Sequence, residues 1–374
     1  MSLVAADSRQ DIQDGIGRIG RIPVRNLWLL MLYASHLFKA LENAKVLVED
    51  NPDDIPDLVA EILCRQVERR MQRNLSYGFR SREAVVARVR GHIDILKTER
   101  CRLLDRGKIA CEFDELSIDS VKNRFVRDAL GVASKIVCDR DLVHRCRSLS
   151  GSLRKMGVVG ERPGRREVFA VRYDRHEVDD QAMISAALLI FDLALPTEAE
   201  GMVHLPSPDR EITWIRKLYE KGIAGFYDVV LAGRGWVVQP GKTLAWPIDG
   251  QSTRIEAILP GMRTDIVMDH LGSQRRIVID TKFNSITTGG WYREETLRSG
   301  YIFQIYAYLR SQEGNGDPLS EKAAGILLHP SVGERVNEAV VIQNHEIRFA
   351  TVDLGAKARE VRKQLMEIIE VPLA

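Results

Sequence analysis

The strongest constraint on the fold is a pair of apolar segments separated by a short turn. Met262–Met268 precedes a turn at Leu271–Ser273, and Arg276–Phe283 follows that turn. This spacing predicts a β-hairpin. The continuous apolar run Ile277–Ile279 is typical of a central strand that is covered on both faces. We therefore expect the hairpin to lie inside a sheet flanked by helices.

Three charged residues lie at one end of this hairpin. Side chains two residues apart on a strand share a face, so Asp280 and Lys282 should emerge together while Thr281 points away. Asp265 lies on the neighbouring strand. Two carboxylates would hold Mg²⁺, which prefers oxygen ligands and keeps several waters. Lys282 would orient or deprotonate the attacking water and offset charge on a scissile phosphate.

Two flanking helices are expected to contribute further residues. The stretch Ile212–Phe226 has helical periodicity and carries Glu220, a candidate third metal ligand. The stretch Thr296–Gln312 reads as an amphipathic helix. Gln304 and Tyr308 lie four residues apart on one face of it, where they could reach the metal site or a DNA backbone.

The order of these elements resembles that of the PD-(D/E)xK nuclease superfamily. It runs from the helix with Glu220 through the hairpin to the helix with Gln304, and then to a strand at Ala324–Leu328. We expect an α/β (α+β) fold with a restriction-endonuclease-like domain at residues 166–374, built on a mixed central sheet flanked by helices. A mixed α+β domain at residues 1–165 should precede it, because residues 157–164 are the most linker-like segment.

Sequence periodicity predicts the remaining elements of the first half of the chain. The expected helices are 26–41, 55–74, 116–137 and 181–195, and the expected strand is 84–95. We find no internal repeat and no low-complexity tract.

Four stretches of the chain, taken together and in order, resemble the McrC family, the nuclease subunits of McrBC modification-dependent restriction systems. They are Ile22–Ala34 (IPVRNLWLLMLYA); Arg90–Asp94 with Phe113–Leu116 and Asn123-Arg124; Met262–Asp265 with Val278–Phe283; and Gln304–Tyr308 with Gly325–Pro330. Each stretch is weak alone, but their shared order makes the resemblance strong over nearly the whole chain.

The resemblance implies roles for the residues named above. Asp265, Asp280 and Lys282 would form the catalytic set, with Mg²⁺ as the cofactor and Gln304 as an accessory residue. Glu220 stands where the family has a variable Glu or Gln, and Gly222 replaces an expected aromatic residue. Glu220 would be the third metal ligand, at a position that varies within the family.

The resemblance also implies partners. In this family the N-terminal part is a stalk that inserts into the pore of a hexameric AAA+ GTPase, McrB, and the partner reads the DNA, which would contain modified cytosine. No Walker A sequence occurs in this chain, as expected if the partner binds the nucleotide. Arg and Lys residues of 116–137 are candidates for the contact.

Charge and cysteine content exclude other classes of protein. A net charge of +2 does not indicate nucleic-acid binding through bulk charge, so any DNA contact must come from local patches. Five cysteines without a Cys-x-x-Cys pair argue against a disulfide framework and against zinc. The polar first twenty residues are not a signal peptide, and no apolar stretch is long enough to span a membrane. We expect a cytoplasmic protein.

The motif Gly15–Gly20 matches G-x-G-x-x-G, but a dinucleotide fingerprint must follow a buried strand and open directly into a helix. Here the preceding segment is polar and Pro23 interrupts the approach to the next helix, so no nucleotide cofactor is expected.

Two alternatives to the restriction-system nuclease remain open. One is a stand-alone nuclease of the same fold that acts on branched or damaged DNA. The other is a non-catalytic activator of the GTPase, which is disfavoured because both aspartates and the lysine are present.

Overall fold

The structure is a computed structural model that describes residues 18–19, 22–35, 37–38, 54–171, 178–198, 208–288 and 295–370. The chain divides into two compact units. Unit 1 contains residues 1–55 and 195–374, and unit 2 contains residues 56–194. This division differs from the expected one at 165/166. The linker-like segment 157–164 lies inside unit 2, where the backbone N–H groups of Val159 and Gly160 donate to the Asp119 carboxylate.

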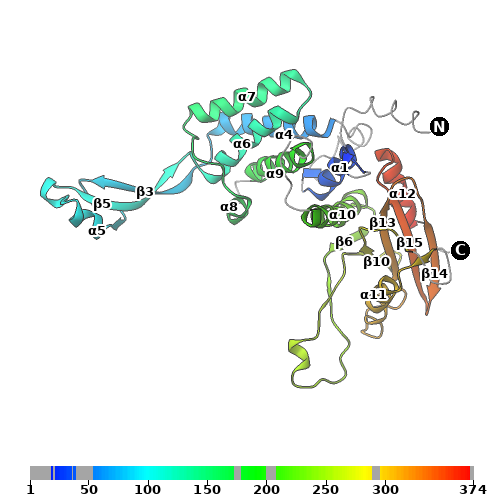
Figure 1. Ribbon diagram of the computed structural model, residues 1–374. Coiled ribbons are helices and arrows are strands. Elements are labelled where there is room, and N and C mark those ends of the chain that lie inside the picture. The colour runs from blue at the N-terminus through cyan, green and yellow to red at the C-terminus, as the bar shows by residue number, and fades with distance from the viewer. Residues whose placement is uncertain are drawn as a thin grey trace. The chain divides into compact units, whose positions relative to one another are not determined.

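Unit 1 is built on a mixed six-stranded sheet (Figure 1). Its strands, in spatial order, are β14 (Asn337–Ile342), β15 (His345–Asp353), β13 (Ala324–Ser331), β10 (Arg275–Thr281), β9 (Ile266–His270) and β6 (Trp236–Pro240). The pairs β10–β13 and β13–β15 are parallel, and the others are antiparallel. The expected hairpin is confirmed as β9 and β10, and the expected mixed sheet flanked by helices is also confirmed.

Both faces of β10 are buried, as its apolar run predicts. Val278 joins a core cluster with Val267 and Leu327, and this cluster includes Ile305 of helix α11 (Ser299–Arg310). The opposite face is also closed, since Ile277 and Ile279 are fully buried. A central strand covered on both faces holds the residues at its end in fixed positions.

Helix α11 lies close to the sheet at one glycine. A Cβ atom added at Gly325 on β13 would come 2.7 Å from Cγ1 of Ile305. The absence of a side chain at this position therefore lets the helix approach the strand closely. The close approach of α11 to β13 brings the side chains of α11 near the end of β10.

Helix α1 (Val24–Ala34) packs against helix α10 (Pro208–Val230) within unit 1. The close contact depends on glycines in α10, because an added Cβ at Gly225 would come 1.9 Å from the carbonyl oxygen of Tyr33. Gly222 stands in place of an expected aromatic residue. A Cβ atom added there would come 3.0 Å from Cδ2 and from the carbonyl oxygen of Leu30. The expected helix 26–41 is too long: α1 ends at Ala34, since Ser35 is extended and its Oγ donates to the Leu32 carbonyl oxygen.

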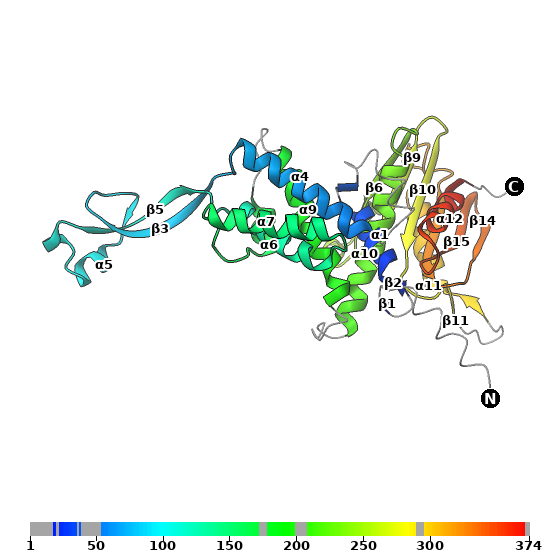
Figure 2. The ribbon, with the colours of Figure 1, turned by 90° about the horizontal axis from the view of Figure 1, so that it is seen from above.

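Unit 2 combines helices with a long antiparallel hairpin, which Figures 1 and 2 show extending away from them. The helices are α4 (Ile55–Arg73), α6 (Val121–Ile136), α7 (Arg140–Lys155), α8 (Arg165–Ala170) and α9 (Val178–Glu198). The hairpin consists of β3 (Gly78–Val86) and β5 (Ile109–Ser117), with β4 (His92–Ile93) and α5 (Ile95–Arg100) near its distal end.

Two predictions in this region were wrong at their boundaries. The expected strand 84–95 is divided between β3 and β4, because Gly91 adopts a positive φ of 60° and turns the chain. The expected helix 116–137 begins only at Val121, where the Ser120 side chain caps it, and Leu116 belongs to β5. Helices 55–74 and 181–195 are confirmed as α4 and α9.

Smaller elements complete the described part of the chain. They are β1 (Arg18–Ile19), β2 (Ile22–Pro23), η3 (Leu104–Arg106), β7 (Thr243–Leu244), η4 (Ile255–Ala257), β8 (Met262–Arg263), β11 (Thr287–Thr288), β12 (Thr296–Leu297) and α12 (Ala358–Glu370). The glycine motif 15–20 lies outside the described residues except for β1, which pairs with β2. All five cysteines are free thiols, as expected. Within the described ranges, no helix combines the length and apolarity needed to cross a membrane.

Candidate active site

Asp265 and Asp280 lie at one end of the β9–β10 hairpin. The register of the pair ends with Ile279 opposite Ile266, so Asp280 and Asp265 are the next residues outward on the two chains. Residues directly opposite in an antiparallel pair share a face and lie about 4.5–5.5 Å apart at Cβ. Oδ2 of Asp265 accepts hydrogen bonds from the backbone N and the Oγ1 of Thr281, both at 2.7 Å. Asp265 is near enough to Asp280 to raise its pKa, while both of these hydrogen bonds join Asp265 to Thr281.

Asp280 is a buried carboxylate, with only 1% of its surface exposed. Burial raises its pKa from 3.8 to about 6, Lys282 opposes this shift, and the nearby Asp265 adds to it. Its Oδ2 lies 2.7 Å from Nζ of Lys282 as an ion pair and accepts no well-aligned hydrogen bond from the described residues. A buried carboxylate is costly unless it is paired, and here the ammonium group of Lys282 pairs with it.

Lys282 is held by a chain of hydrogen bonds from helix α11. Its Nζ donates to Oε1 of Gln304 at 2.9 Å, and Nε2 of Gln304 donates to the hydroxyl oxygen of Tyr308 at 2.7 Å. The Tyr308 hydroxyl in turn donates to the Arg263 carbonyl oxygen at 2.9 Å. Gln304 and Tyr308 therefore reach the site as predicted, but their hydrogen bonds go to the lysine and the backbone.

A second group of residues supports Lys282 from the other side, and sequence reasoning missed it. Nζ of Lys282 lies 4.9 Å from the ring centre of Tyr301, whose hydroxyl accepts a hydrogen bond from Nδ2 of Asn284 at 2.6 Å. Nδ1 of His329 lies 2.9 Å from the Asn284 carbonyl oxygen, which can only accept, so Nδ1 carries the proton. Burial lowers the pKa of His329. The quoted stretch Gly325–Pro330 contained His329, but only the parallel pairing of β10 with β13 places it beside the lysine.

Glu220 on α10 lies near Asp265 but outside the hydrogen-bonded group. Burial raises its pKa, Asp265 raises it further, and Arg263 opposes the shift. Glu220, Asp228 and Asp265 line one cavity of about 340 Å³. Within the described ranges, no three Asp, Glu, His or Cys side chains are spaced to hold one metal ion. Asp265, Asp280 and Glu220 therefore form no ready-made cage of three ligands.

The donor set nevertheless fits Mg²⁺. The available ligands are carboxylate oxygens, and Mg²⁺ commonly binds through one or two carboxylates while keeping several waters. Asp265 and Glu220 line one cavity, and Asp280 lies near Asp265, so carboxylate oxygens for such a site are present.

Comparison with known proteins gives a family match. A family model described as "McrBC 5-methylcytosine restriction system component" matches residues 6–330. The chain is 23% identical over 352 residues to the "Type IV methyl-directed restriction enzyme EcoKMcrBC" of Escherichia coli (strain K12), which covers 93% of this chain and 97% of that protein.

Two solved structures from Thermococcus gammatolerans also match. One is a half-complex of McrB AAA+ hexamers with bound McrC; it has a TM-score of 0.42 and 14% identity and covers 93% of this chain and 76% of that chain. The other is the McrBC complex; it has a TM-score of 0.30 and 14% identity and covers 49% of this chain and 60% of that chain.

Proposed function

Because the chain belongs to the family of McrBC 5-methylcytosine restriction system components, we propose that it is the McrC-like DNA endonuclease subunit of such a system. Unit 1 would be a Mg²⁺-dependent nuclease of the PD-(D/E)xK type. The observation that carries this proposal is the geometry at the end of β10. Asp280 and Lys282 share a face and form a buried ion pair, and Asp265 stands at the next position of the neighbouring chain.

The proposed mechanism assigns one task to each side chain. Asp265 and Asp280 would hold Mg²⁺, with Glu220 as a third oxygen donor from α10. When bound, Mg²⁺ supplies a Lewis acid for the phosphate and lowers the pKa of water. The ammonium group of Lys282 lies within reach of the same place and would orient the attacking water and stabilise charge that develops on the scissile phosphate.

Gln304 and Tyr301 keep the lysine in that place. Gln304 accepts from Nζ, while the ring of Tyr301 lies at cation–π distance from it. Lys282 therefore has few alternative rotamers, which reduces the entropy lost when it meets the phosphate. Gln304 would act through the lysine as a positioning residue.

Unit 2 would contact the second component of the system, a McrB-like AAA+ GTPase hexamer. Family membership supports such a partner, and the hairpin offers a surface for it, because apolar side chains such as Phe79 and Leu96 are exposed along its length. Two of the basic residues of 116–137 are not available for this contact. Lys122 is buried beside Asp180, and Arg127 is buried against Asp128 and the Val158 carbonyl oxygen.

The substrate would be DNA that contains modified cytosine, with the partner reading the modification. The test is cleavage of a methylated and an unmethylated plasmid by the purified chain, with and without a McrB-like partner and GTP. Cleavage of methylated DNA that requires Mg²⁺, GTP and the partner supports the proposal. Cleavage of branched or damaged DNA by the chain alone would favour a stand-alone nuclease, and GTPase stimulation without cleavage would favour a non-catalytic activator.

A further inference from the structure

The two strands of the unit 2 hairpin separate where they reach the helices, and one side chain spans the gap. Pairing of β3 with β5 ends at Gly78 opposite Ser117. Just beyond this pair, Nδ2 of Asn123 on α6 donates to the carbonyl oxygen of Ser76 at 2.9 Å and to that of Ile118 at 2.8 Å. Asn123 is only 2% exposed. Its amide therefore bonds both roots of the hairpin to one helix.

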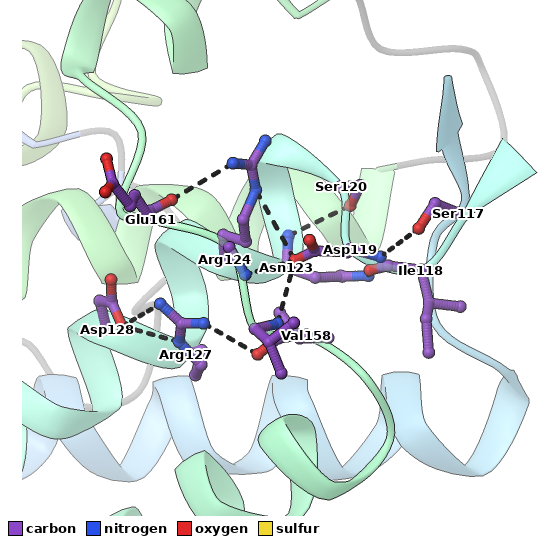
Figure 3. A network of polar contacts seen from close by, with 12 residues as sticks. Ser117, Ile118, Asp119, Ser120, Asn123, Arg124, Arg127, Asp128, Val158 and Glu161 are labelled. Carbon is purple, nitrogen blue, oxygen red and sulfur yellow. Dashed lines mark hydrogen bonds and ion pairs between the residues drawn. The ribbon is translucent and has the colours of Figure 1, made fainter. Parts of the chain in front are cut away.

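The β5 root is fixed by additional contacts around Asn123 (Figure 3). Ser120 caps α6 by accepting from the backbone N of Asn123 at 3.3 Å. Oδ1 of the buried Asp119 accepts from the backbone N–H groups of Val159 and Gly160, each at 3.1 Å. The chain that leaves β5 is thus tied both to the start of α6 and to the loop after α7.

The β3 root is fixed by a buried charged group. The Ser76 hydroxyl donates to Oδ2 of Asp180 at 2.6 Å and accepts from Nη2 of Arg70 at 3.0 Å. Nζ of Lys122 lies 3.5 Å from the same Asp180 oxygen, and Asp180 is fully buried. Helices α4, α6 and α9 therefore converge on the residue whose carbonyl group Asn123 binds.

Steric contact adds a second restraint at the same point. A Cβ atom at Gly78 would come 2.8 Å from Cβ of Ser120, closer than real Cβ contacts allow. The first residue of β3 thus lies directly against the N-cap of α6. Beyond the roots, exposed side chains such as Phe79, Leu96 and Leu104 line the hairpin, so its direction depends mainly on the contacts at its base.

We propose that Asn123 is the positioning residue that sets the direction of the β3–β5 hairpin relative to the helices of unit 2. The hairpin then acts as a rigid lever whose distal end meets the GTPase partner; this last step rests on the proposed function. Loss of the amide leaves a buried carbonyl group of Ser76 and a part-buried one of Ile118 without this donor and removes the bridge between the strands. The helices should remain folded while the hairpin gains freedom of direction.

The natural cysteines allow a direct measurement. Cys101, which follows α5 near the distal end of the hairpin, and Cys138, between α6 and α7, are exposed, whereas Cys64, Cys111 and Cys146 are buried. Spin labels on the two exposed thiols of the full chain would report the distance between hairpin and helices. The variants are Asn123→Ala and Gly78→Ala. Ser134→Ala is the matched control, because it removes a part-buried hydrogen bond of a buried side chain from the same helix, eleven residues from Asn123.

The distance distribution should be at least about twofold wider in Asn123→Ala than in the wild type. Its mean should shift in Gly78→Ala, and Ser134→Ala should match the wild type. Circular dichroism establishes that each variant is folded. A wild-type distribution in folded Asn123→Ala would overturn the proposal. If that variant does not fold, Gly78→Ala decides, and an unchanged mean distance overturns it.

Stimulation of a McrB-like GTPase separates this inference from the proposed function. Asn123→Ala should require about tenfold more protein for half-maximal stimulation, as expected when a preorganised contact is lost. If Asn123→Ala shows a wider distance distribution and still needs no more protein than the wild type for half-maximal stimulation, the proposal that the hairpin acts as a rigid lever is overturned. If the wild-type chain does not stimulate the GTPase, the proposed partner is wrong, while the label distances still decide the role of Asn123.

Discussion

Asp280 is a buried carboxylate whose pKa is raised from 3.8 to about 6, mainly by burial. A raised pKa means that the folded state binds the proton more tightly than the unfolded state does. The protonated carboxyl group of Asp280 therefore stabilises the folded state fully below about pH 4. This stabilisation is lost as the pH rises through about 6. At neutral pH the charged group costs about 3 kcal/mol of folding free energy, at 1.36 kcal/mol per pKa unit.

Asp280→Asn should consequently stabilise the protein at pH 8 by up to about 3 kcal/mol. The gain should shrink as the pH falls toward 5, because the wild-type carboxyl group is then partly protonated. Urea unfolding of both proteins across this range measures the difference. A variant that is less stable than the wild type at pH 8 would show that the buried charge is fully compensated.

Mg²⁺ should reduce the difference in stability between the wild type and Asp280→Asn. A ligand that binds only the folded state stabilises it by about 2.7 kcal/mol at one hundred times its dissociation constant. Mg²⁺ should therefore raise the Tm of the wild type and have a much smaller effect on Asp280→Asn, which lacks one carboxylate. Equal shifts in the two proteins would place the Mg²⁺ site elsewhere.

Lys282→Ala should reduce Mg²⁺-dependent DNA cleavage by about 10²–10³, the usual effect of losing one electrostatic contact to a transition state. Lys282→Arg should recover little activity, because the guanidinium is larger, planar and always protonated. Lys363→Ala is the control, since Lys363 is an exposed lysine of the same unit. Cleavage rates of a methylated plasmid with the partner and GTP present measure the effect. A wild-type rate in Lys282→Ala would mean that Asp-Thr-Lys is only a strand end.

The alternation of strand side chains was enough to predict the shared face of Asp280 and Lys282, and the hairpin spacing predicted Asp265 opposite them. Gln304 was predicted near the site from helical spacing, and it lies there bonded to Lys282. Tyr301 and His329 were missed, since their place depends on the loop after β10 and on parallel pairing with β13. Their roles in catalysis, like those of the predicted residues, remain predictions.

At the scale of elements, the contact of α1 with α10 depends on small residues. Gly225→Ala should improve intrinsic helix propensity by about 1 kcal/mol. The added Cβ would nevertheless come 1.9 Å from the Tyr33 carbonyl oxygen, so overpacking should dominate and give a net loss of about 1–3 kcal/mol. Gly300→Ala in α11 is the control, because nothing lies within 4 Å of its added Cβ. Chemical denaturation measures both; a Gly225→Ala variant as stable as the control would mean that the helices separate at little cost.

Helices and strands with a strong period were predicted well, whereas elements that end at special residues were not. Helix α4 and the hairpin β9–β10 follow their apolar patterns closely. The expected strand 84–95 was wrong because a glycine with positive φ interrupts it, and the expected helix 116–137 began too early because Ser120 caps α6. Periodicity alone does not distinguish the apolar end of β5 from the start of the following helix.

At the scale of the whole molecule, residues 1–55 belong to the same compact unit as the proposed nuclease. Helix α1 reaches that unit through its packing on α10 and through Asn26, whose Nδ2 donates to the Leu354 carbonyl oxygen. Packing between segments far apart in the sequence leaves no local signal, so a linker-like composition at 157–164 suggested a different boundary. The division into units places the proposed metal-binding residues in unit 1 and the hairpin in unit 2.

This division of labour is tested most directly by Asp280→Ala, assayed for two activities in the same preparation. DNA cleavage, measured on a methylated plasmid with Mg²⁺, GTP and the McrB-like partner, should be abolished, because a carboxylate of the proposed metal site is gone. Stimulation of the partner's GTPase should stay close to the wild-type level, because the hairpin belongs to the other unit. Cleavage at the wild-type rate, or loss of both activities in a folded variant, would contradict the account.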